Sequence, residues 1–139
     1  MIIAKLLWLT GSLIFTVLGT THMLYTFFTD KFSSRKKRVI DEMKASSPNL
    51  TAETTMWKAW TGFNASHSSG AIFIGVVNFY LALQHFDLIQ TDAFFFDLNL
   101  VTTGFYLWLA KKYWFQIPFI GILLTLFCFF ISYVLTRFK

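Results

Sequence analysis

The sequence has 139 residues, the length of one ordinary domain, and only 14% of them are charged, against about a quarter in soluble domains. Hydrophobic residues make up 55%; the 18 phenylalanines exclude a disordered chain, and the single cysteine excludes a disulfide-bonded scaffold. The formal net charge is +5 at pH 7. The composition therefore indicates a multi-pass membrane protein.

Four stretches are long enough to cross a bilayer as helices, since a hydrocarbon core of about 30 Å needs about 20 apolar residues. They cover residues 6–28, 59–84, 93–110 and 115–135. The third is the shortest and contains Asp97 near its expected outer end. The runs are too long and unbroken for barrel strands. We therefore expect an all-α membrane protein, a single domain (residues 1–139) of four antiparallel transmembrane helices.

A basic, amphipathic segment follows the first span. Its apolar residues share one face at helical spacing: Phe32, Val39, Ile40 and Met43. The basic residues that point largely away from that face are Arg35, Lys36, Lys37 and Arg38. This pattern is typical of a short helix on the membrane surface, where cations meet anionic lipid headgroups. No base-stacking platform accompanies the short basic run, so we expect no nucleic-acid partner.

The second span is unusually rich in hydrogen-bonding side chains. We expect its helix to begin with Thr51 as the N-cap and Glu53 in the first turn. One face, at 4-3-4-3 spacing, comprises Trp60, Asn64, His67, Ala71, Ile74, Asn78, Leu81 and His85. A row of small residues, Gly62, Ser66 and Gly70, repeats every four positions and predicts close contact with another helix.

Two histidines fall at matched depth in the first two spans. His22 is seven residues from the end of its span and His67 is eight from the start of the next, or ~10–12 Å at 1.5 Å per residue. Because a short loop makes the two helices neighbours, we expect the imidazoles to face one another. The candidate ligand-binding residues are His22, Asn64 and His67, with Tyr25 and Ser68 as neighbours.

Several interpretations of this pair stay open. In the first, the residues form a buried polar network that holds the two helices together. In the second, they form a site for a small ligand, a quinone or a lipid headgroup, at which histidine donates a hydrogen bond or moves a proton. Bis-histidine ligation of haem b, with His22 and His67 as axial ligands, is a third interpretation, and a metal ion a fourth. The function we expect is binding of a small ligand or lipid headgroup. An accessory subunit of a larger membrane complex and a haem b electron carrier are the alternatives, and nothing identifies a reaction.

The remaining spans offer less chemistry. Asp97 is close enough to the expected membrane surface to reach headgroups or water, which argues against an ion relay. In the fourth span a stripe of smaller residues predicts the side that faces the bundle: Gly121, Thr125, Cys128 and Ser132.

Basic residues predict the orientation. Those expected on one side are Lys31, Arg35, Lys36, Lys37, Arg38, Lys44, Lys58, Lys111 and Lys112, against Lys5, Arg137 and Lys139 on the other. The positive-inside rule then places both termini outside and both basic loops in the cytoplasm. The partners we expect are the lipid bilayer and a larger membrane complex or a homo-oligomer.

Two segments, residues 54–70 and 18–27, resemble a family of small bacterial four-helix integral membrane proteins whose activity is uncharacterised. The most specific part is the Gly-Phe-Asn-x-Ser-His signature at residues 62–67, and the resemblance covers roughly the first two spans. It implies a protein of the bacterial inner membrane and brings no established activity.

Overall fold

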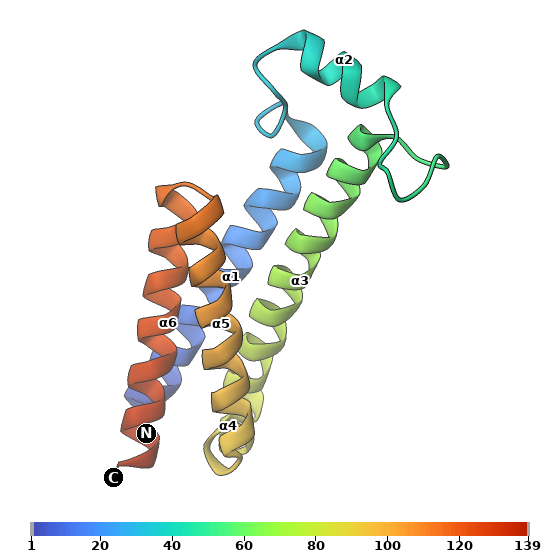
Figure 1. The fold of residues 1–139 in the computed structure, drawn as a ribbon. Helices are drawn as coiled ribbons and strands as arrows, with labels where there is room; N and C mark the ends of the chain where they lie inside the picture. The colour runs from blue at the N-terminus through green and yellow to red at the C-terminus, as the bar shows by residue number, and fades with distance from the viewer. Residues whose placement is uncertain (1, 139) are drawn as a thin grey trace. The chain divides into compact units, whose positions relative to one another are not determined.

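The computed structural model describes residues 2–138, which form six helices and no strand (Figure 1). The helices are α1 (Ile2–Phe28), α2 (Lys37–Ala45), α3 (Met56–Gln84), α4 (Phe86–Thr91), α5 (Ala93–Tyr113) and α6 (Gln116–Arg137). Four of them, α1, α3, α5 and α6, are long and apolar enough to cross a membrane. The predicted all-helical class and the four candidate spans are therefore confirmed.

Local sequence explains where several helices begin. The Asp92 side chain accepts a hydrogen bond of 2.9 Å from the Phe94 backbone N–H and so caps α5. Pro118 lies in the first turn of α6, where backbone N–H groups have no partner within the helix, so the N–H that proline lacks costs no hydrogen bond. The prediction that Thr51 caps the second span was wrong. Its hydroxyl instead accepts from Glu53 N–H in a loop, and the Thr55 hydroxyl accepts from Lys58 N–H at the start of α3.

The chain divides into two compact units by its internal contacts. One contains the chain up to Leu18 together with everything from Ala71 onward, and the other contains Gly19–Gly70. Helices α1 and α3 each contribute a segment to both units. The first unit is called the helical core unit below, and the second is called the loop unit.

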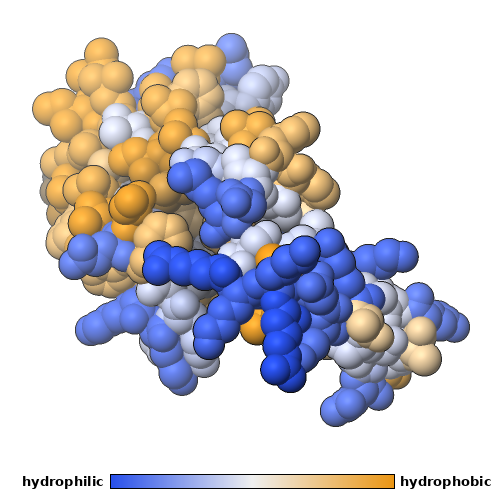
Figure 2. All heavy atoms as spheres, turned by 90° about the horizontal axis from the view of Figure 1, so that it is seen from above, coloured by the Kyte–Doolittle hydropathy of each residue, from blue (hydrophilic) through white to orange (hydrophobic). Residues whose placement is uncertain are grey.

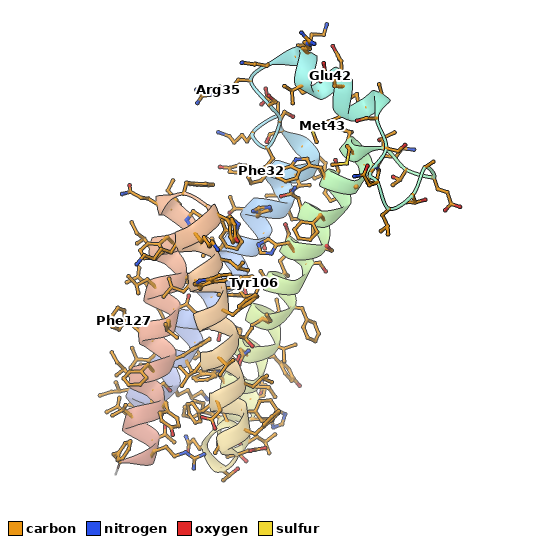
Figure 3. All side chains as sticks on the ribbon, viewed as in Figure 1. Phe32, Arg35, Glu42, Met43, Tyr106 and Phe127 are labelled. Carbon is orange, nitrogen blue, oxygen red and sulfur yellow. The ribbon has the colours of Figure 1, made fainter. Side chains whose placement is uncertain are left out.

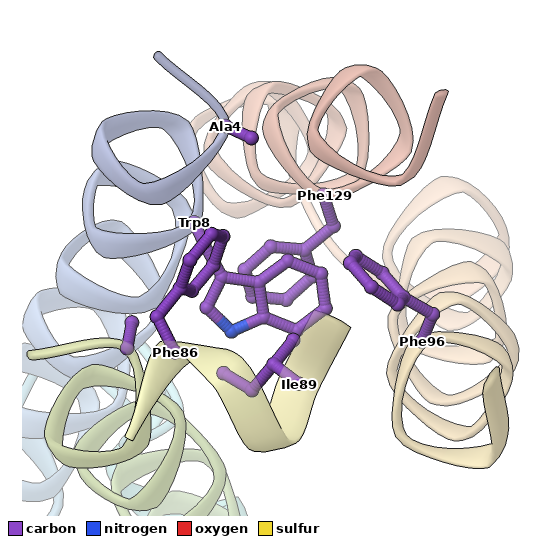
Figure 4. Packing of buried hydrophobic residues seen from close by; sticks show 7 residues of the cluster. Ala4, Trp8, Phe86, Ile89, Phe96 and Phe129 are labelled. Atoms are coloured by element: carbon purple, nitrogen blue, oxygen red, sulfur yellow. The ribbon is translucent and has the colours of Figure 1, made fainter. Parts of the chain in front are cut away.

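An indole lies at the centre of the helical core unit. Trp8 stacks on Phe129, with ring centroids 4.2 Å apart, and meets Phe96 edge-to-face at 4.8 Å (Figure 4). The same cluster includes Ala4, Ala82, Phe86 and Ile89. Between membrane helices, close packing and hydrogen bonds replace much of the hydrophobic driving force. Large rings packed against alanines supply that close contact here.

The predicted inward stripe of the fourth span is present in α6. Thr125 and Ser132 are buried, and their hydroxyls donate to the α1 carbonyl oxygens of Gly11 (3.3 Å) and Ala4 (2.8 Å). Cys128 is half-buried, while Phe129 is fully buried. The inward face of α6 therefore combines two hydroxyl residues with the side chains of Ile122 and Phe129.

The prediction of close contact along the row of small residues was wrong for Gly62 and Ser66. Gly62 and Ser66 are exposed, and nothing lies within 4 Å of a Cβ built on Gly62. The buried positions of α3 are instead Asn64, Ser68, Ala71, Gly75, Asn78 and Ala82. Positions two residues apart point about 200° apart on a helix, so the small row lies almost opposite the buried row. The close contact is made by Gly75, which lies against Ser12 and Thr16 of α1.

Candidate functional site

The loop unit brings together the three residues at the centre of the predicted site. His22 lies near the end of α1, and Asn64 and His67 lie in the first half of α3. His22 Nε2 and Asn64 Oδ1 are 3.0 Å apart. The His67 ring meets the His22 ring edge-to-face, with centroids 5.3 Å apart and planes at 69°. The two imidazoles and the amide therefore form one contiguous cluster, called the His–Asn cluster below.

The hydrogen bonds of Asn64 determine which imidazole nitrogen of His22 carries a hydrogen. Asn64 Nδ2 donates to the Trp60 carbonyl oxygen at 2.8 Å, so the amide oxygen is the atom turned toward His22. An amide oxygen can only accept, and His22 Nε2 must therefore be the donor. This assignment leaves Nδ1 of a neutral His22 as the proton-accepting nitrogen.

The loop that follows α1 covers one face of the cluster. The Phe32 ring stacks on the His22 ring at 4.3 Å, with planes at 29°. Trp60 Nε1 donates to the Phe32 carbonyl oxygen at 3.2 Å and so ties the loop to α3. The sequence indicates neither contact, because its amphipathic pattern predicts a segment that lies on the membrane surface.

The two predicted neighbours of the cluster have other roles. The Tyr25 ring lies 6.3 Å from Phe32, and the Lys31 ammonium lies 5.2 Å from the centroid of the Tyr25 ring. Ser68 is fully buried, and its hydroxyl donates to the Asn64 carbonyl oxygen at 2.7 Å. Tyr25 thus belongs to the covering loop, and Ser68 stabilises the backbone of α3.

A small hollow of about 30 Å³ adjoins the cluster, enough for one or two water-sized groups. Its lining consists of Thr26, Thr29, Phe32, Ser33, Trp57, Trp60, Thr61 and Asn64. Of these, only Asn64 was predicted as a site residue. A usable signal existed, because Trp57, Thr61, Asn64 and Ser68 follow a 4-3-4 spacing that places them on one helical face.

The geometry of the cluster does not suit haem. A porphyrin held by His22 and His67 would have to lie between their rings, which are in direct edge-to-face contact. The Nε2 atom of His22 is also bonded to Asn64, and one ring face is covered by Phe32. Among residues 2–138, no three His, Cys, Asp or Glu side chains come together as a metal site. The two imidazoles and the amide are groups that form hydrogen bonds.

A second polar network lies in the helical core unit. The Asn78 side chain accepts from Trp8 Nε1 at 3.2 Å and donates to Asn99 Oδ1 at 2.7 Å. The amides also donate to backbone carbonyl oxygens, from Asn78 to Ile74 and from Asn99 to Phe95. Both amides therefore have side-chain and backbone partners within the protein, as expected of a structural network.

Comparisons of the chain with protein-family models, curated proteins and solved structures give no match.

Proposed function

We propose that the chain is a multi-pass membrane protein, an antiparallel four-helix bundle, whose His–Asn cluster binds a lipid headgroup or another small hydrogen-bonding ligand. The observation that carries this proposal is the 3.0 Å contact between His22 Nε2 and Asn64 Oδ1 at the edge of a hollow lined by hydroxyl groups. Polar groups in a membrane span are costly unless they are paired or used. A hollow of this size with polar groups in its lining can hold one small polar group of a ligand.

The contrast with the second network supports binding over a purely structural role. The amides of Asn78 and Asn99 lie in a well-packed unit. The His–Asn cluster instead adjoins unfilled space, because Asn64, which contacts His22, lines the hollow. Histidine is the side chain best suited to exchange a proton near neutral pH.

Removing the cluster should release bound lipid. We expect His22→Ala and Asn64→Ala to lower the amount of co-purified lipid about five- to tenfold, or about 1–1.4 kcal/mol, because either change removes the hydrogen bond that holds Asn64 in the lining of the hollow. Native mass spectrometry of protein purified in mild detergent measures it. His85→Ala is the matched control, because His85 is exposed and lies outside the loop unit. If the cluster variants lose thermal stability but keep their lipid, the cluster is structural and the proposal fails.

The segment between the first two spans is proposed to lie on the cytoplasmic leaflet. Phe32 and Met43 are half-buried and lie on the side of the segment that meets α1 and α3, whereas Arg35 and Glu42 project away (Figure 3). In the view from above, hydrophilic side chains gather over one part of the surface, and another part is largely hydrophobic (Figure 2). The proposed contacts with anionic lipids come from Arg35, Lys36, Lys37 and Arg38. Arg38 is also paired with Glu42 at 2.8 Å.

The proposed orientation has both termini outside, in a bacterial inner membrane, and it can be tested with single cysteines. In a Cys128→Ser background, Ser46→Cys and Thr91→Cys place a thiol at exposed loop and helix-end positions. We expect a membrane-impermeant maleimide to label Thr91→Cys in intact spheroplasts and Ser46→Cys only after permeabilisation. The reverse pattern would place the basic loop outside and contradict the positive-inside assignment.

A further inference from the structure

The hollow beside the His–Asn cluster presents hydrogen-bond acceptors. The hydroxyls of Thr26, Thr29 and Thr61 each donate, at 2.9 Å, to the carbonyl oxygen four residues earlier in the chain. Each hydroxyl hydrogen is thereby used, while the oxygen keeps lone pairs that can accept. Asn64 Oδ1 is paired with His22 Nε2, and Asn64 Nδ2 donates to the Trp60 carbonyl oxygen. A ligand hydroxyl that enters the hollow can therefore donate to the threonine oxygens.

Size and charge narrow the choice of donor. The hollow, of about 30 Å³, admits a hydroxymethyl end and is too small for a trimethylammonium group. Lys44 Nζ lies 5.5 Å from the ring centroid of Trp57, a lining residue, and Lys31 Nζ lies 5.2 Å from that of Tyr25. These cations disfavour an ammonium group and favour an anion beside the hollow. A neutral hydroxyl next to a negative charge fits both conditions.

We infer that the site binds an anionic phospholipid through a hydroxylated headgroup, with the terminal hydroxyl in the hollow and the phosphate near Lys31 and Lys44. Phosphatidylglycerol is the simplest lipid with this chemistry. Free glycerol phosphate shares it but lacks the acyl chains that a membrane span would contact. The inference rests on the proposed function, because it names the ligand class of the same site.

The first experiment compares headgroups. The detergent-solubilised full chain is offered equimolar phosphatidylglycerol, phosphatidic acid, phosphatidylethanolamine and phosphatidylcholine with identical acyl chains, and bound lipid is counted by native mass spectrometry. We expect the amount of bound phosphatidylglycerol to exceed that of phosphatidic acid about fivefold, the effect of roughly one hydrogen bond. We expect it to exceed the amount of bound phosphatidylcholine by a larger factor. Equal retention of the two anionic lipids, or a preference for either zwitterionic lipid, would overturn the inference. Free glycerol phosphate is added as a competitor, and displacement would show that the headgroup alone suffices.

The second experiment removes the acceptor without changing shape. Thr61→Val should lower the amount of bound phosphatidylglycerol to that of phosphatidic acid, and it should leave the amount of bound phosphatidic acid unchanged. Thr10→Val is the control, since Thr10 is an exposed threonine of α1 whose hydroxyl makes the same kind of backbone bond, to Leu6. If His22→Ala abolishes lipid retention while Thr61→Val changes nothing, the proposed function stands and only the headgroup assignment fails.

The third experiment removes the cations. Lys31→Gln combined with Lys44→Gln should lower retention of both anionic lipids, about fivefold for each charge removed. Lys111→Gln combined with Lys112→Gln is the matched control, because Lys112 also lies over aromatic rings, those of Trp108 and Tyr113, outside the loop unit. Equal losses in both double variants would show that net charge, and not the site, retains the lipid.

Discussion

Gly75→Ala is expected to lower the free energy of unfolding by about 1–3 kcal/mol, the usual effect of overpacking a close contact. A Cβ at this position would lie 2.7 Å from the Thr16 backbone nitrogen and 2.9 Å from the Ser12 carbonyl oxygen. Both are backbone atoms of α1 and cannot rotate away, so one of the two helices must shift. The loss can be measured by unfolding in mixed micelles with increasing SDS.

Gly62→Ala supplies a matched control in the same helix. Nothing lies within 4 Å of a Cβ at Gly62, and alanine has a higher helix propensity by about 1 kcal/mol. We therefore expect this variant to be neutral or slightly more stable than the native chain. Equal destabilisation by the two substitutions would show that Gly75 makes no special contact with α1.

Asn78→Leu is the second substitution with a large expected effect. It removes the acceptor of Trp8 Nε1 and the donor to Asn99 Oδ1 while keeping a side chain of similar volume. Each buried group left without a partner costs about 1–3 kcal/mol, and in membrane proteins the pairwise coupling averages about 0.6 kcal/mol. We expect a total loss of about 2 kcal/mol in the same unfolding assay.

A double-mutant cycle tests whether these groups act together. In a Trp8→Phe background the indole N–H is already absent, so Asn78→Leu should cost less than it does in the native chain. Asn49→Ala, at an exposed loop position, controls for loss of an asparagine as such. Strict additivity of the Trp8 and Asn78 substitutions would contradict the hydrogen bond between them.

The centre of the candidate site was accessible from the sequence because it depends on depth and connectivity. His22 and His67 are at similar distances from their span ends, and a short loop joins the two helices. The covering of His22 by Phe32 was not predictable, since it depends on a turn in the loop and on the Trp60 to Phe32 hydrogen bond. The threonine lining was not predicted, because each hydroxyl bonds to the carbonyl oxygen four residues earlier, as threonines in helices commonly do, and this pattern marks no site.

What the sequence by itself determined is the set of four apolar spans and the basic loop, because hydropathy and length are properties of contiguous residues. What only the tertiary structure decided is how each helix is rotated about its axis. Lipid tails and neighbouring helices are both apolar. The residue types in a row such as Gly62, Ser66 and Gly70 therefore do not show whether the row faces lipid or another helix. The burial of Gly75 and Asn78 depends on the residues that α1 and α5 present to them, whereas no side chain among residues 2–138 covers Gly62.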